Sequence, residues 1–169
     1  MARVRRPAAA PIAVDLTVEA GDWPAVETLH GLVARAVAAA VGKVRPPLVA
    51  DAELSVVFTD DRHIRALNRR YRKKDAATNV LSFPAAPTSA GRIGPLLGDI
   101  VLAAETIARE AGVQGLTVTD HLTHLLVHGF LHLLGYDHQA DAEAIEMEKL
   151  ETAILLSLGI ADPYADGGA

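Results

Sequence analysis

The sequence contains no cysteine among its 169 residues. A disulfide framework, a thiolate nucleophile and a cysteine-bearing metal site are therefore excluded, and any metal must bind nitrogen or oxygen atoms. Long hydrophobic runs are also missing. The longest uncharged run, between Asp120 and Asp137, carries four histidines and is shorter than the roughly 18 residues of a membrane-spanning helix. We therefore expect a protein without membrane spans.

The N-terminus lacks a segment of the signal-peptide type. Its first residues are basic, but Pro11 and Asp15 interrupt the chain before an apolar stretch of sufficient length. Half of the residues are hydrophobic and 22% are charged, which is typical of a globular domain. We expect a soluble, cytoplasmic protein with a flexible arm at residues 1–11, a single domain at 12–160 and a C-terminal tail at 161–169.

Charge is distributed unevenly along the chain. The formal net charge is −5, yet residues 62–74 contain seven lysines and arginines and no acidic residue. A negative net charge argues against a nucleic-acid partner, whereas a local run of +7 is typical of a surface that binds a polyanion.

The periodicity of apolar residues predicts an α+β fold, with a single small mixed four-stranded sheet flanked by about five helices. Capping residues and glycines set the expected helix ends; Asp22 and Gly42, for example, would bound the first helix. The predicted strands are 12–18, 53–59, 78–83 and 98–102. The predicted helices are 23–42, 62–72, 104–110, 119–134 and 140–158.

The predicted helix 119–134 is apolar on nearly every face and should be buried. Its four histidines, His121, His124, His128 and His132, fall within an arc of about 80° on a helical wheel. Buried imidazoles without partners each cost about 1–3 kcal/mol. The line of histidines therefore indicates either a metal site or a set of hydrogen-bonded core residues.

The histidine spacing favours the metal site. His128 and His132 lie one helical turn apart and can share an ion, whereas His124 is too far along the axis to join both. Gly135 allows the chain to turn back and bring His138 to the same ion. Three imidazoles leave a fourth position open, as in catalytic zinc sites. We predict one Zn²⁺ per chain, although three imidazoles also accept copper, nickel or cobalt.

The same spacing occurs in the metzincin proteases. That family has its general-base glutamate directly after the first histidine, and this chain has Gly129 there. The absence of that glutamate argues against a zinc peptidase, which stays a lesser alternative.

The string HGFLHLLGYDH, from His128 to His138, closely resembles the signature HGxLHLxGYDH of the YbeY family of bacterial and organellar endoribonucleases. Two further segments agree with the family's pattern. They are the block from Leu67 to Pro84 and the tail from Met147 to Gly159. The resemblance covers roughly residues 54–159.

The resemblance implies a zinc-dependent, single-strand-specific endoribonuclease whose zinc is held by His128, His132 and His138. It adds Arg72 to these three as a catalytic residue, placed in the cleft as a phosphate clamp. It also implies action in rRNA processing at the 3′ end of small-subunit rRNA, and in ribosome biogenesis and quality control. The implied partners are single-stranded RNA, the small ribosomal subunit and assembly factors such as an Era-type GTPase.

Several alternatives stay open at this point. The zinc could be structural, in a ribosome-assembly module that binds RNA, and Arg72 could belong to a solvated helix face. Cleavage could use hydroxide or the RNA 2′-hydroxyl as the nucleophile. Aromatic residues make up only 4% of the chain, so we expect little reading of base sequence by stacking. The last helix should turn its acidic residues to solvent: Asp141, Glu143, Glu146, Glu148 and Glu151.

Overall fold

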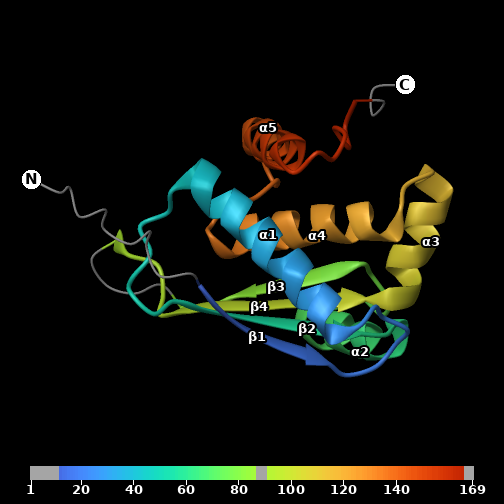
Figure 1. Cartoon of the computed structure of the whole chain (residues 1–169). Helices are drawn as coiled ribbons and strands as arrows, with labels where there is room; N and C mark the ends of the chain where they lie inside the picture. The colour runs from blue at the N-terminus through green and yellow to red at the C-terminus, as the bar shows by residue number, and fades with distance from the viewer. Residues whose placement is uncertain (1–11, 87–90, 166–169) are drawn as a thin grey trace, which may run out of the picture.

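The computed structural model describes residues 12–86 and 91–165, so the predicted arm at 1–11 lies outside the described residues. Within those two ranges the chain forms five helices and one four-stranded sheet (Figure 1). The predicted α+β class is therefore confirmed. None of the helices in this part of the chain is long and apolar enough to cross a bilayer.

The sheet is mixed and has the strand order β1-β2-β4-β3. Strands β1 (Ala13–Val18), β2 (Glu53–Thr59) and β4 (Leu96–Ala103) run parallel to one another. Strand β3 (Val80–Pro84) pairs antiparallel with β4 and forms one edge of the sheet. The sheet separates the two helical layers, and the candidate site lies beside its β3 edge.

Alternating side chains give the sheet two unequal faces. Leu54, Val56 and Phe58 of β2 point to the main core, which α1 (Val26–Val44) and α4 (Val118–Leu133) cover. The opposite face carries a smaller cluster under α2 (Asp61–Arg72), the helix that lies below the sheet in Figure 1. That cluster contains Ile64, Leu81, Val101 and Ala103.

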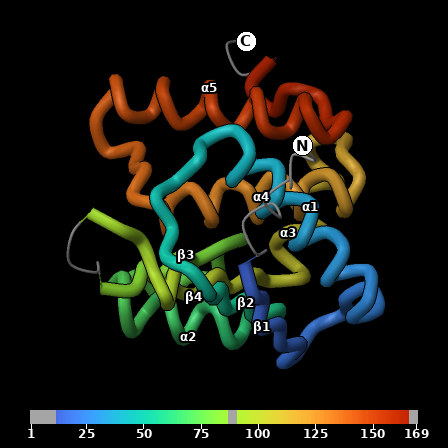
Figure 2. Tube along the Cα trace, turned by 60° about the vertical axis from the view of Figure 1, so that its left-hand side comes forward, coloured from blue at the N-terminus to red at the C-terminus, as the bar shows by residue number. Residues whose placement is uncertain are grey.

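Helix α4 is central to the main layer, as its apolar character predicts. It packs on β3 and β4, on α1 and on α5 (Asp141–Ser157), which closes the layer from outside (Figures 1 and 2). Helix α3 (Ala104–Gln114) joins β4 to α4 and packs against the N-terminal part of α4. Helix α4 thus packs against α1, α3 and α5 and against strands β3 and β4.

Two expected ends of the first helix are wrong. Helix α1 begins at Val26 with Ala25 as the N-terminal cap, not Asp22. The indole of Trp23 donates to the carbonyl oxygens of Ala20 and Thr59, at 2.9 and 3.1 Å, and holds the preceding segment against the sheet. The helix continues past Gly42, and Arg45 takes the left-handed closing conformation.

The other helix boundaries shift by smaller amounts. Asp60 caps α2, because its side chain accepts a hydrogen bond from the amide of His63. Helix α3 continues through Gly112 and ends before Gly115. Thr117 caps α4, which begins at Val118 rather than at residue 119.

Candidate metal centre

Helix α4 and the turn after it bring three histidines together. His128 and His132 project from successive turns of the helix, and Gly135, with φ of +102°, allows the chain to reverse before His138. One ring nitrogen from each histidine lies within 4.8 Å of the others. The predicted three-histidine group is therefore present as a spatial cluster.

The three side chains fit a zinc ion. The Nε2 atoms of His128 and His132 are 3.1 Å apart, close to the roughly 3.3 Å that two ligand nitrogens of a tetrahedral zinc would show. Burial, followed by the nearby His128 and His138, lowers the pKa of His132. The neutral imidazole, which is the form that binds metal, is thereby favoured.

A buried carboxylate orients one of these imidazoles. Oε1 of Glu151, on α5, lies 2.5 Å from Nδ1 of His128, so the other ring nitrogen of His128 can present its lone pair to a metal. Oε2 of Glu151 lies 2.7 Å from Nε2 of His124 and accepts a hydrogen bond from the hydroxyl of Tyr164 at 2.5 Å. We call His124, His128, Glu151 and Tyr164 the histidine–glutamate cluster.

The environment keeps Glu151 ionised. Burial alone would raise the pKa of this carboxyl, but hydrogen bonds from His124, His128 and Tyr164 outweigh burial and lower its pKa to about 2. Burial and the contact with Glu151 raise the pKa of Tyr164, whose hydroxyl therefore stays a donor. A fixed negative charge therefore lies beside Nδ1 of His128.

The expectation that Glu151 faces solvent is wrong, since its side chain is 1% exposed. Glu151 occupies the apolar stripe of α5 between Met147 and Ile154, at helical spacing. A lone carboxylate in an apolar stripe, opposite a helix with several imidazoles, was the signal available in the sequence. The other four acidic residues expected on the solvated face are exposed.

Arg72 lies at the C-terminal end of α2, on the other side of the sheet from α4. Its Nη2 donates to the backbone carbonyl of Ser82 on edge strand β3, at 2.8 Å, and its guanidinium carbon lies 5.2 Å from the ring centroid of Phe83. The hydroxyl of Ser82 donates in turn to the carbonyl of Gly129, at 3.2 Å. Arg72 therefore reaches the sheet edge on which α4 packs.

Gly129 explains why the metzincin glutamate has no counterpart here. A Cβ atom at this position would lie 3.0 Å from Oγ of Ser82 and 3.1 Å from Cγ2 of Ile100. This side of α4 faces the sheet, so a glutamate would be directed into close packing rather than toward the three histidines.

Other side chains of the histidine segment have separate partners. Asp137 accepts a hydrogen bond from the backbone amide of His138 at 2.7 Å and thus stabilises the turn. Nε2 of His121 lies 3.0 Å from Oε1 of Glu110 on α3. His124 contacts Glu151 and Tyr164, and its ring lies nearly perpendicular to that of His128, with the ring centroids 6.4 Å apart.

Comparison with solved structures supports the fold. A Thermotoga maritima protein solved in solution is similar to 89% of this chain and 97% of its own, with a TM-score of 0.54 at 20% identity. This likeness concerns the fold alone.

Sequence comparison is more specific. The chain is 55% identical over 159 residues to a protein named Endoribonuclease YbeY from Rhizobium meliloti, covering 90% of this chain and 95% of that relative. A protein of the same name from Agrobacterium fabrum is 51% identical and covers 92% of this chain and 96% of its own length. A family model described as Endoribonuclease YbeY matches residues 21–159. The chain therefore belongs to the YbeY family of endoribonucleases, which are hydrolases acting on RNA.

Proposed function

We propose that this protein is a zinc-dependent endoribonuclease that hydrolyses phosphodiester bonds of single-stranded RNA. The observation that carries the proposal is the convergence of one nitrogen each from His128, His132 and His138, in a member of an endoribonuclease family. Zinc at such a site supplies a Lewis acid that polarises a phosphoryl oxygen and makes water a stronger nucleophile near neutral pH.

The side chains of this chain then divide the remaining work. His128, His132 and His138 would hold the ion, and Glu151 keeps the His128 ring in its metal-facing orientation through the 2.5 Å contact with Nδ1. The carboxylate is too deeply buried to reach substrate. Glu151 is therefore a positioning residue in this proposal.

Arg72 would bind the phosphate. One guanidinium nitrogen of Arg72 donates to the carbonyl of Ser82. Arg72 is exposed, so its other donors can be reached from solvent. A guanidinium offers five N–H donors in a planar fork that matches phosphate oxygens. The bond to Ser82 fixes the fork at the β3 edge while leaving donors for a phosphodiester.

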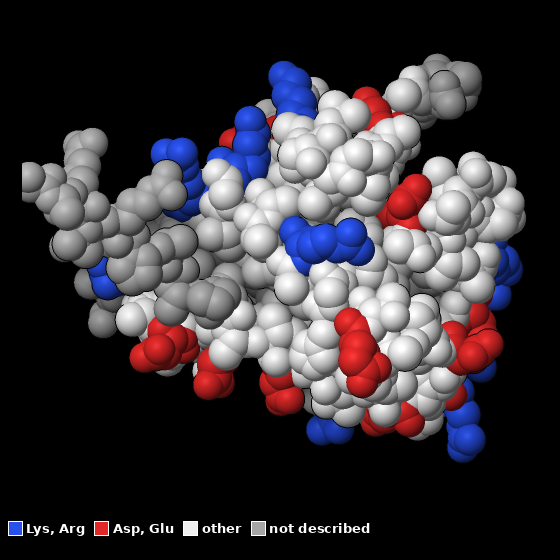
Figure 3. Space-filling model, viewed as in Figure 1, with Lys and Arg blue, Asp and Glu red and all other residues white. Residues whose placement is uncertain are grey.

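A basic face on α2 supports RNA as the substrate. We define it by Arg62, Arg65, Arg69, Arg70 and Lys73, which line a surface groove of about 620 Å³. Figure 3 looks from the side of α1 and shows a different face, with several basic side chains at its upper left and a row of acidic side chains along its lower edge. An RNA backbone bound along α2 would pass the β3 edge at Arg72 on its way to the histidines.

The cellular role we propose follows from the family. It comprises processing of small-subunit rRNA at its 3′ end, together with ribosome biogenesis and quality control in the cytoplasm. The partners proposed on the same ground are the small ribosomal subunit and assembly factors such as an Era-type GTPase.

The test combines metal analysis with cleavage of labelled RNA. The purified parent should hold one zinc per chain and cut a single-stranded RNA but not the matching duplex. Arg72→Ala should keep the zinc and cut at least about tenfold more slowly, because a charge-assisted contact to phosphate is lost. Mapping the phosphate at the new ends distinguishes attack by water from attack by the 2′-hydroxyl.

His30→Ala, on an exposed position of α1, is the control and should match the parent. Equal cleavage by the parent, Arg72→Ala and His128→Ala would refute the proposal. A protein that unfolds when its zinc is chelated and never cuts RNA would instead be an RNA-binding module with a structural metal.

A further inference from the structure

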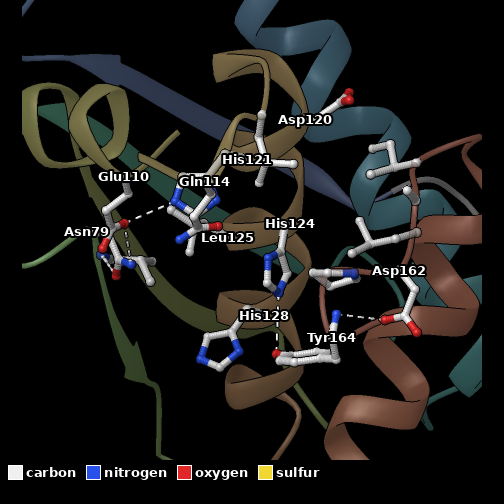
Figure 4. Close-up of a pocket in the computed structure, with 16 residues that line it drawn as sticks. Asn79, Glu110, Gln114, Asp120, His121, His124, Leu125, His128, Asp162 and Tyr164 are labelled. Atoms are coloured by element: carbon white, nitrogen blue, oxygen red, sulfur yellow. Dashed lines mark hydrogen bonds and ion pairs between the residues drawn. The ribbon is translucent and has the colours of Figure 1, made fainter. Parts of the chain in front are cut away.

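A pocket of about 610 Å³ lies beside the metal centre, between α3, α4, α5 and the segment at residues 160–164 (Figure 4). His128 lines one end, and Glu110 and His121 line the other. His121 and His128 are two turns apart on α4, about 10 Å along the axis. The volume lies within the range of small-molecule sites, and the pocket extends from the metal-binding ring into the protein.

The charges in this pocket differ from those at Arg72. Its lining includes the carboxylates Glu110, Asp120 and Asp162, and no lysine or arginine. Phosphate would be repelled there, because these half-buried carboxylates carry the same negative charge as a phosphate. A neutral group that donates hydrogen bonds is the better match.

Glu110 is held ready to accept such hydrogen bonds. Nδ2 of Asn79 donates to its Oε1 at 2.8 Å, and Nε2 of His121 lies 3.0 Å from the same oxygen (Figure 4). Nδ1 of His121 is buried and has no hydrogen-bond partner within the described residues, so the ring proton belongs on Nε2, where it is donated to Glu110.

A carboxylate has about four acceptor positions. With two donors fixed on Oε1, Glu110 keeps acceptor capacity for a ligand, and its orientation is already determined by the protein.

The pocket also has aromatic and apolar walls. The rings of Tyr164 and His124 are 5.8 Å apart and nearly perpendicular, and both residues line the pocket together with Val80 and Leu125. Tyr164 is fixed by its hydrogen bond to Glu151. Aromatic and apolar walls with a few ordered polar groups are typical of base-binding sites.

We propose that this pocket binds the base of a nucleotide next to the scissile phosphodiester, and that Glu110 makes it prefer bases with an exocyclic amino group over uracil. Cytosine, adenine and guanine can donate that amino group to the carboxylate. Uracil presents a carbonyl oxygen at the equivalent position of cytosine, which the carboxylate repels. The inference rests on the proposed RNA cleavage and adds a base preference to it.

This inference modifies the expectation from composition. Few aromatic residues limit reading by stacking, but a hydrogen-bonded carboxylate can discriminate between bases without a stacking platform. Glu110 does not contact the predicted metal ligands in any hydrogen bond, so its substitution should leave metal binding intact.

The first test compares oligocytidine with oligouridine of equal length, two single-stranded RNAs that differ at the amino or oxo group of each base. The zinc-loaded parent should cleave oligocytidine about tenfold faster. Glu110→Gln should slow oligocytidine cleavage toward the oligouridine rate and retain bound zinc. Glu146→Gln, exposed on α5, is the matched control and should keep the discrimination.

The second test needs no catalysis and no substituted protein. Cytidine and uridine, which carry no phosphate, are titrated into isotope-labelled parent protein and followed by NMR. Cytidine should shift the signals of Asn79, Glu110 and His121 at lower concentration than uridine does.

Equal rates for the two RNAs together with equal shifts for the two nucleosides would overturn the pocket assignment. RNA cleavage would then persist and the proposed function would stand. A parent that cuts neither RNA, yet whose pocket signals respond to cytidine, would instead reject the proposed function while leaving base binding supported.

Discussion

The histidine–glutamate cluster and the basic face of α2 are both rich in titratable groups, but they are built in opposite ways. Glu151 is 1% exposed and has three hydrogen-bond partners. Arg65 on α2 is 58% exposed, and its ion pair with Asp75 is on the surface. Burial with fixed partners makes each group of the first region depend on the others, whereas exposed charges act nearly independently and are screened by salt.

In the proposed function, the first region supplies the chemistry and the second attracts RNA. Strand β3 separates them, and Arg72 reaches its backbone from the α2 side. Substitutions in the first region should therefore produce large effects that salt hardly changes, and substitutions on α2 should produce small effects that vanish at high salt.

The largest effect is expected from His132→Ala. Removing one of three converging nitrogens should abolish the zinc content of the purified protein and reduce RNA cleavage by more than about a hundredfold. This loss should exceed that from replacing a residue that only hydrogen-bonds to a metal ligand, which is about 10- to 100-fold. Elemental analysis and a cleavage assay measure the two quantities. Full zinc content in this variant would exclude the three-histidine site.

The next largest effect is expected from Glu151, whose carboxylate contacts His128. Glu151→Gln keeps the side-chain size but loses the charge that orients His128, and should weaken zinc binding about 10- to 100-fold. Competition with a chelator measures the affinity. Glu143→Gln, at an exposed position of the same helix, is the control, and equal affinities for the two variants would contradict the positioning role.

A smaller effect is expected where α4 meets the sheet. Gly129→Ala places a Cβ atom 3.0 Å from Oγ of Ser82 and should lower the free energy of unfolding by about 1–3 kcal/mol. Gly31→Ala, on α1 with no atom within 4 Å of the added carbon, should raise it by about 0.5–1 kcal/mol. Urea unfolding of both variants gives the two values, and an unchanged stability for Gly129→Ala would reject close packing here.

The smallest effect is expected on the basic face. Arg69→Ala should weaken RNA binding a few-fold at low salt and reduce the slope of log affinity against log salt by about 0.7, the value for one phosphate contact on a single strand. Arg65→Ala should change binding less, because Arg65 already pairs with Asp75 at 2.9 Å. Fluorescence anisotropy at several salt concentrations compares them; a salt slope unaltered in both variants would remove α2 from the RNA path.

Local features of the sequence were enough to predict much of this arrangement. The buried helix 119–134 and the turn at Gly135 follow from periodicity and from the conformational freedom of glycine, and both are present. The mixed four-stranded sheet was also predicted correctly. The periodicity of single elements, the positions of turns and the number of strands were accessible in this way.

Long-range contacts were not accessible. Glu151 lies 23 residues from His128, and the direction in which α5 packs cannot be read from its own acidic residues. Likewise, Glu110 meets His121 and Asn79 only after α3 folds against α4 and the sheet. The position of Asp22 gave the wrong start for α1, because tertiary hydrogen bonds of Trp23 override the local capping preference.

The most direct test of the account is a titration of zinc into the metal-free, full-length protein, with the cleavage rate of a single-stranded RNA measured at each step. We predict that the protein stays folded without zinc, that cleavage rises with added zinc, and that it reaches a plateau at one equivalent per chain. Cleavage at full rate before any zinc is added, or no cleavage at the plateau, would contradict the account.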